Sequence, residues 1–269
     1  ALTIMVLNGI ALWKQEPRRP GGTMDEPVTP RFSDTWKTLA AIPGFKRLLT
    51  VVGLGTAAFN MQDILLEPFG GQVFGLPVGE TTMLMAALAG GMLIGFFIAE
   101  RLLNRAVEAM RVIGLGLVIG IIAFAGVIAA PLIGSLGLFR IASLTVGIGA
   151  GLFSVGTLTA MMGCGTAKMS GILLGSWGAV QATVAGLSIA FSGAARDIIA
   201  SLARAGRSGE ALSHPATGYV AVFILEIALL FATLIAALPL FGTGGRRHER
   251  QNPLSSYWDE GRSEGYKEA

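Results

Sequence analysis

The sequence predicts an all-α membrane protein whose core is a bundle of six transmembrane helices. Of its 269 residues, 52% are hydrophobic and only 14% are charged, and the mean hydropathy is +0.65. These values lie outside the range of ordinary soluble domains. Apolar windows long enough to cross a hydrocarbon core of about 30 Å recur along the chain, without the alternating segments of an outer-membrane barrel. We expect spans at residues 48–69, 82–99, 112–130, 138–161, 171–191 and 219–241.

The segments that flank the bundle are of three kinds. Residues 1–13 are apolar but too short to cross a bilayer alone, and we interpret them as the end of a preceding transmembrane helix, with a short interfacial anchor as the alternative. Residues 14–47 form a Pro-rich linker and then a helix that suits either the membrane surface or a plain connector. The bundle covers residues 48–241, and a charged tail covers 242–269. We therefore expect a missing N-terminal half or partner subunit, and an apolar or Gly-rich face that receives it.

Basic residues predict the orientation of the bundle. The segment up to Arg47 holds seven Lys or Arg, and the tail and the loops after the second and fourth spans are also basic. The loops 70–81 and 131–137 hold none, although the loop 192–218 holds three. Because Lys and Arg concentrate in short cytoplasmic loops, we expect both ends of this chain in the cytoplasm. The formal net charge of +3 follows from this bias and indicates no nucleic-acid partner.

Small residues spaced four apart predict where the helices pack closely. Four such pairs lie in the expected spans: Gly91/Gly95, Gly116/Gly120, Gly147/Gly151 and Gly171/Gly175. Glycine at this spacing lets two helix backbones approach each other in lipid, where no hydrophobic drive operates between helices. We interpret the Gly-rich runs as packing sites rather than nucleotide-binding loops, because none of them follows a predicted strand.

The first span carries four polar residues in its second half: Asn60, Gln62, Asp63 and Glu67. Ionisable groups inside a spanning helix are costly and mark functional or pairing sites. Asp63 and Glu67 stand one turn apart on the same helix face, where two like charges repel. Arg140, which opens the fourth span from the same side of the membrane, is the expected partner. The pairing indicates either a structural clamp between helix ends or a site that responds to an ion or ligand.

Two later spans carry isolated polar side chains. Glu226 lies among apolar neighbours in the sixth span, so its carboxyl group must be protonated or paired. A structural hydrogen bond is one interpretation, and a contact with a pigment or lipid is the other. Gln181 and Trp177 lie in the fifth span, where hydrogen bonding between helices and aromatic packing are the simplest explanations.

The sequence argues against an enzyme. It holds one cysteine and two histidines, with no metal-ligand spacing, P-loop, HExxH motif or Ser–His–Asp set. We expect no catalytic residues and no metal site built from protein ligands. Because no expected span contains a histidine, a magnesium-centred pigment would need another ligand. The candidates are Asn60, Gln62, Gln181, Glu226, a backbone carbonyl or water.

Residues 91–105, GMLIGFFIAERLLNR, resemble the acidic–basic loop signature of the major facilitator superfamily. The matching positions are Gly95, Glu100, Arg101 and Arg105, with the acidic–basic pair one residue later than in that signature. Six spans preceded by a basic linker and the end of another helix also resemble the C-terminal half of a twelve-helix facilitator. The resemblance implies that this bundle forms one half of such a fold.

The run FNMQDILLEPFGGQVFGLPVGETT, residues 59–82, is similar to the PucC family of bacteriochlorophyll-delivery proteins, and residues 170–197 extend the similarity. The resemblance implies an assembly factor for light-harvesting antenna complexes in the bacterial photosynthetic inner membrane. It implies bacteriochlorophyll as the cofactor, and antenna α and β polypeptides and pigment-synthesis enzymes as partners. The positions that carry it are Asn60, Gln62, Asp63, Glu67 and Gly70.

Two other functions fit the same residues. A proton-coupled secondary transporter would use Asp63 or Glu226 as a group that cycles between protonation states. A structural subunit of an antenna complex would have no turnover. Solute uptake that collapses with the proton gradient would identify the transporter, and stoichiometric retention in the mature complex would identify the structural subunit.

Overall fold

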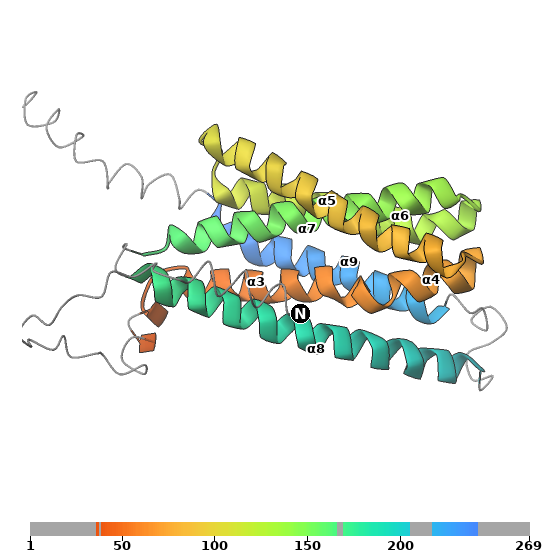
Figure 1. Ribbon diagram of the computed structural model, residues 1–269. Helices are drawn as coiled ribbons and strands as arrows, with labels where there is room; N and C mark the ends of the chain where they lie inside the picture. The colour runs from red at the N-terminus through yellow and green to blue at the C-terminus, as the bar shows by residue number, and fades with distance from the viewer. Residues whose placement is uncertain (1–35, 38, 166–168, 205–216, 242–269) are drawn as a thin grey trace, which may run out of the picture. The chain divides into compact units, whose positions relative to one another are not determined.

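The computed structural model describes residues 36–37, 39–165, 169–204 and 217–241, and in these ranges it contains helices and no strand (Figure 1). The main helices are α3 (Phe45–Asn60), η1 (Met61–Ile64), α4 (Leu66–Phe74), α5 (Val78–Asn104), α6 (Ala109–Ile133), α7 (Leu136–Met162), α8 (Ser170–Arg204), α9 (Thr217–Ala237) and η4 (Leu238–Leu240). Five helices are long and apolar enough to cross a membrane, and α3 with η1 and α4 makes a sixth if that bent pair is one span. The all-α membrane class is confirmed.

The helices begin and end close to the expected spans, with two differences. The loop expected at 70–81 is reduced to residues 75–77, because α4 continues to Phe74 and α5 begins at Val78. The fifth expected span is extended in α8, which continues to Arg204 and so carries Arg196 on a helix rather than in a loop. The expected helix end at 1–13, most of the linker and the tail 242–269 lie outside the described residues.

The first span is broken, whereas the sequence predicted one continuous helix. After Asn60 the chain tightens into the 3₁₀ turn η1, and α4 then continues at 45° to the direction of the preceding segment. Pro68 explains the position of the break. In a continuous helix its ring would clash with the carbonyl group of Ile64 and would leave that carbonyl without a donor, but in the first turn of a new helix proline is tolerated. The break therefore falls where η1 ends, at Ile64.

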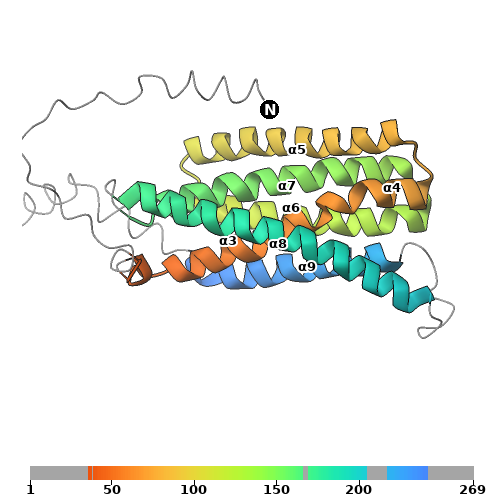
Figure 2. The ribbon, with the colours of Figure 1, turned by 60° about the horizontal axis from the view of Figure 1, so that its bottom comes forward.

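Glycine sets the packing of the three helices α5, α6 and α7, with α7 between the other two (Figure 2). A Cβ atom added to Gly91 or Gly95 of α5 would collide with the backbone of α7, and one added to Gly147 or Gly151 would collide with the backbone of α5. Between them, Gly149 faces the backbone of α6. These close backbone contacts confirm the predicted packing role of the glycine pairs in α5 and α7.

Gly171 and Gly175 do not pack in this way, and the prediction for that pair is wrong. No atom of the described residues lies within 4 Å of a Cβ added at either position. The reason is the place of α8, which runs alongside α3 at the side of the bundle (Figures 1 and 2). Only 11% of its most apolar window is buried, against 61% for α7. The small residues of α8 therefore form an open face.

Aromatic rings fix α4 in the bundle. The ring of Phe69 lies 5.2 Å from that of Phe223, 5.5 Å from that of Tyr219 and 5.5 Å from that of Phe139, measured between centroids. Such tilted and edge-on contacts add to the stabilisation from burial. The second half of the broken span is thus attached to α7 and α9, independently of α3.

Candidate ligand site at the helix break

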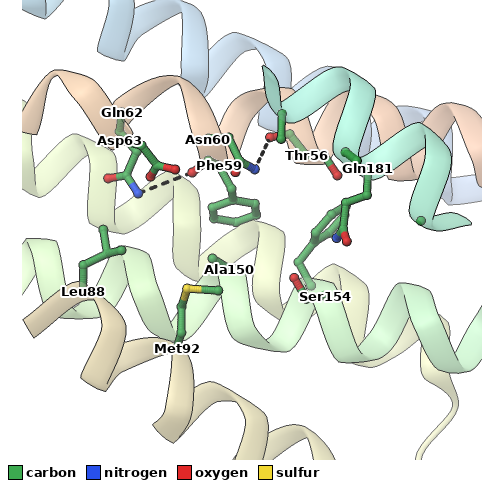
Figure 3. Close-up of a pocket in the computed structure, with 14 residues that line it drawn as sticks. Thr56, Phe59, Asn60, Gln62, Asp63, Leu88, Met92, Ala150, Ser154 and Gln181 are labelled. Atoms are coloured by element: carbon green, nitrogen blue, oxygen red, sulfur yellow. Dashed lines mark hydrogen bonds between the residues drawn. The ribbon is translucent and has the colours of Figure 1, made fainter. Parts of the chain in front are cut away.

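A pocket of about 390 Å³ lies beside the break in the first span (Figure 3). Its walls come from α3 and η1, from α5, from α7 and from α8. The polar lining residues are Thr56, Asn60, Gln62, Asp63, Ser154 and Gln181, and the apolar ones are Phe59, Leu88, Met92, Ala150, Phe153, Gly178, Ala182 and Ala185. The volume falls within the range of small-molecule sites.

Two amide side chains at the end of α3 are held by the backbone of that helix (Figure 3). Asn60 Nδ2 donates to the carbonyl oxygen of Thr56 at 2.7 Å, and Gln62 Nε2 donates to that of Phe59 at 3.4 Å. Both bonds use the donor end of the amide, so each side-chain oxygen is left for another partner. The Thr56 Oγ1 and Gln62 Oε1 atoms are buried without a hydrogen-bond partner among the described residues. Such atoms call for a bound water or ligand.

Asp63 is the acidic residue of the pocket. Its side chain is exposed, and in the described part of the chain it has neither a hydrogen bond nor an ion pair. Glu67 follows on α4, beyond the break, and is half-buried outside the pocket lining. The bend therefore separates two carboxylates that a continuous helix would have placed on one face.

Arg140 does not pair with Asp63 or Glu67, and the prediction of that pair is wrong. Its Nη2 atom donates instead to Glu80 Oε2 at 2.7 Å, which links the first turns of α7 and α5. The two side chains are 49% and 41% exposed. Glu80 was expected in a loop, but the early start of α5 brings it to the same end of the bundle as Arg140. A half-exposed pair at a helix end avoids most of the cost of burying charge.

Two side chains of α8 face α7 and the pocket. Gln181 lines the pocket beside Ser154 of α7. One turn away, Trp177 Nε1 donates to Thr157 Oγ1 at 3.3 Å, which joins α8 to α7. Trp177 thus has a polar contact between helices in addition to the packing that the sequence indicated, and Gln181 keeps its amide available to the pocket.

Glu226 lies behind the break, away from the pocket lining. It is fully buried, and neither oxygen of its carboxyl group has a hydrogen-bond partner among the described residues. Asp63 is close enough to interact with it electrostatically. The expected burial of this carboxyl group is confirmed, and the described residues offer it no hydrogen bond, so the choice between a structural hydrogen bond and a pigment or lipid contact stays a prediction.

The sequence analysis missed a polar cluster around Arg196. Arg196 Nη2 donates to Tyr219 OH at 2.6 Å and to Gln72 Oε1 at 3.2 Å, and its guanidinium carbon lies 4.6 Å from the centroid of the Tyr219 ring. Asp197 accepts from Nη1 at 2.7 Å. The cluster joins α8, α9 and α4 at one end of the bundle. The sequence did contain a signal for this cluster: Arg196 lies in the segment 192–218, which was expected on the side of the membrane with few basic residues and yet holds three.

The loop-signature residues lie on α5, away from the pocket. Gly95 packs on the backbone of α7 at Ile148, and Glu100 accepts a hydrogen bond from Asn104 at 3.4 Å. Arg101 and Arg105 are exposed at the end of the helix. Gly95 thus serves helix packing, and Glu100, Arg101 and Arg105 place charge at the end of α5.

The lining indicates what the pocket can hold. Phe59 and Phe153, with ring centroids 5.6 Å apart, form an apolar wall, and uncommitted side-chain oxygens face it from α3 and η1. In the described residues no group of three His, Cys, Asp or Glu could hold a metal ion by itself. The pocket therefore offers single neutral amide groups, Asn60 and Gln181, beside an apolar and aromatic wall, which suits a mainly apolar ligand with one polar contact.

Comparison with known proteins identifies relatives along most of the chain. Residues 1–245 match the family described as "PUCC protein". An "Uncharacterized protein in puhA-bchM intergenic region" of Rhodobacter capsulatus is 49% identical over 242 residues, which cover 89% of this chain and 50% of that protein. "Protein PucC" of Cereibacter sphaeroides is 42% identical over 240 residues, covering 89% of this chain and 51% of that protein.

A more distant relative is the "Bacteriochlorophyll synthase 44.5 kDa chain" of Rhodobacter capsulatus, 30% identical over 215 residues that cover 74% of this chain and 47% of that protein. No solved structure matches the chain. The chain spans about half the length of the curated relatives it matches.

Proposed function

Because this chain belongs to the PucC family, we propose that it acts in the assembly of bacterial light-harvesting antenna complexes, where it holds bacteriochlorophyll before the pigment reaches the antenna polypeptides. Its place would be the photosynthetic inner membrane, with both ends of this chain in the cytoplasm. The observation that carries the proposal is the pocket at the helix break, in which the side-chain oxygens of Asn60, Asp63 and Gln181 face an apolar wall inside a membrane bundle.

The residues of the pocket divide the work of holding such a pigment. Phe59, Phe153 and Met92 offer the apolar and aromatic contacts that a planar macrocycle needs. The magnesium ion of the pigment would supply a Lewis-acid centre that accepts one oxygen ligand. Asn60, whose side-chain oxygen makes no hydrogen bond to the described residues, and Gln181, whose whole amide group is available, would be the candidates for that ligand. Asp63 can accept a hydrogen bond from a donor group on the pigment. No enzymatic step is required of these side chains.

The open face of α8 supports a further part of the proposal, namely a partner in the membrane. Its exposed small residues include Gly171, Gly175 and Gly186, each with no atom within 4 Å of an added Cβ. Since the relatives are about twice as long, we propose that this face receives either the remaining half of a facilitator-like bundle or an antenna polypeptide.

The test is pigment retention by protein gently purified from pigment-producing membranes. We expect the wild-type protein to carry bacteriochlorophyll and to co-purify with antenna polypeptides or pigment-synthesis enzymes. The double variant Asn60→Leu with Gln181→Leu should lose most of the pigment while it folds normally. Thr145→Val is the matched control, because the Thr145 hydroxyl is exposed on α7 and bonds only to its own helix. Wild-type protein without pigment, or equal retention in the pocket variant and the control, would refute the proposal.

A proton-coupled transporter is the second candidate, and the acidic pair Asp63 and Glu226 around the break favours it. Transport would require uptake of a solute that stops when the proton gradient is dissipated. Pigment binding without such uptake supports the assembly role. Uptake in vesicles that contain the protein and no pigment would support the transporter.

A further inference from the structure

Two buried side chains at the break, Gln62 and Glu226, carry oxygens that are closed off from the pocket, although Gln62 itself belongs to the pocket lining. Gln62 is 1% exposed and Glu226 is 0% exposed. The side-chain oxygen of Gln62 and both carboxyl oxygens of Glu226 have no hydrogen-bond partner among the described residues. Buried polar atoms without partners are rare, and each costs about 1–3 kcal/mol. Three such atoms on two neighbouring elements need a common explanation.

Packing contacts place Glu226 level with the break. On one side, Phe223 packs on Phe69 of α4, with ring centroids 5.2 Å apart. On the other side, Leu230 and Phe59 meet at Gly120, where an added Cβ would lie 3.2 Å from Leu230 Cδ1 and 2.7 Å from Phe59 Cζ. Because Glu226 is about one helical turn from both Phe223 and Leu230, it stands opposite η1, which joins α3 to α4. Helix α9 contacts η1 directly.

Among the residues that the structure describes, no cation compensates Glu226 at this level. The elements packed on α9 are α3, η1, α6, α8 and η4, and α4 also touches it through the ring of Phe69. The charged side chains that the structure describes on these elements are Asp63 in η1, Glu67 in α4 and, towards the ends of the helices, Lys46, Arg47, Arg111, Arg196 and Asp197. Asp63 and Glu67 are acidic, and the cations lie two helical turns or more from the level of Glu226. A fully buried carboxylate with no cation is costly inside a membrane, and this cost favours the neutral, protonated form.

We propose that Glu226 is an intramembrane proton-binding site, and that its proton is donated to the side-chain oxygen of Gln62, directly or through one buried water molecule. The two groups are complementary, because the Gln62 oxygen needs a donor and a protonated carboxyl group has one O–H. Gln62 already holds the last turn of α3 through Nε2. Its oxygen then ties that turn to α9, so Glu226 is a positioning residue for the wall of the pocket. The inference does not depend on the identity of the pocket's ligand.

Infrared spectroscopy of the purified wild-type protein in lipid nanodiscs tests the proton. A protonated carboxyl group has a carbonyl-stretching band apart from the amide bands. We expect such a band, and we expect it to shift on labelling with carboxyl-¹³C glutamate and to persist in D₂O because the group is buried. Absence of the band would overturn the proposal. So would a band that shifts only with labelled aspartate, since the proton would then lie on Asp63. Isotope labelling and exchange into D₂O both use the wild-type protein, so this test does not depend on the folding of a variant.

Variants test the hydrogen bond. Glu226→Gln should remove the band but keep an N–H donor for Gln62, so the protein should fold. Gln62→Leu should keep the band and move it to higher frequency, because the carboxyl group loses its acceptor. Asp63→Asn is the control and should leave the band in place. A band that keeps its position in Gln62→Leu would show that the proton serves another acceptor and would overturn the pairing.

Discussion

The pair α5–α7 and the span made of α3, η1 and α4 cross comparable lengths of the bundle but are built in opposite ways. The pair is continuous, and glycines bring its backbones into contact at Gly91, Gly95, Gly147 and Gly151. The broken span has a proline, a 3₁₀ turn and a set of polar side chains at its centre. The glycine contacts leave no room for ligands, whereas the break leaves both a pocket and buried oxygens without partners. Close backbone packing and the pocket thus lie in different spans of the same bundle.

The largest effect should come from the glycine contact. Gly147→Ala places a Cβ against the carbonyl oxygen of Leu88, and a backbone atom cannot move aside as a flexible side chain can. We expect a loss of about 3 kcal/mol or more in the free energy of unfolding, at the upper end for overpacked sites, because the colliding atoms belong to the backbone. Gly175→Ala is the matched control, because its Cβ meets nothing and alanine favours the helix by about 0.5–1 kcal/mol. Denaturation in detergent measures both, and equal destabilisation would break the comparison.

The next effect concerns the attachment of the broken span at its far end. Arg196→Leu removes the donor that joins Gln72, Tyr219 and Asp197, and we expect a loss of about 1.5–3 kcal/mol because these hydrogen bonds involve a charged group. Tyr219→Phe keeps the ring contacts with Phe69 and should cost less, about 1 kcal/mol. The same denaturation assay checks the order. A larger loss in Tyr219→Phe would show that the hydroxyl has a partner other than Arg196.

The break itself can be tested through Pro68. Pro68→Ala restores a backbone N–H and removes the clash with Ile64, so a continuous helix becomes possible. We expect amide hydrogens of residues 61–66 to exchange more slowly, as measured by hydrogen exchange with mass spectrometry. Pro131→Ala is the control, because Pro131 lies inside α6 and away from the break. Unchanged exchange in Pro68→Ala would show that tertiary packing, rather than proline, holds the bend.

The smallest effect concerns the charges. The pair Arg140–Glu80 is half-exposed, so Arg140→Gln should cost no more than about 1 kcal/mol. Asp63→Asn removes a charge without a partner and should not destabilise the protein. In a double-mutant cycle the two changes should therefore be additive, whereas Arg140→Gln and Glu80→Gln should show coupling. Coupling between positions 63 and 140 would indicate a second conformation in which they meet.

The difference between the two regions also explains what could be predicted from the sequence. Apolar length was sufficient for the spans, and glycine spacing was sufficient for the contact of α5 with α7. The same spacing failed at Gly171 and Gly175, because a pattern on one helix does not tell whether a second helix lies against it. Recognition of a packed pair needs a facing partner with its own small residues, which α7 provides for α5.

The polar residues of the pocket could be listed but not connected. Asn60, Gln62, Asp63 and Gln181 were all selected as costly residues inside spans, and the structure brings all four to one pocket. The partner of Arg140 was predicted wrongly because the early start of α5, which presents Glu80, was taken for a loop. Pro68 is present in the sequence, but the sequence analysis did not predict the bend at this position. Because of the bend, Asp63 lines the pocket and Glu67 does not.

The polar break has a consequence for the biosynthesis of the protein. A segment that carries Asp63 near its centre is inserted reluctantly by the translocation machinery, where a central aspartate costs about 2.5–3.5 kcal/mol. The segment α3–η1–α4 is synthesised before α7 and α8, the helices that cover its polar side chains. Because α7 and α8 follow the broken span along the chain, we expect the pocket to be one of the last features of the bundle to form.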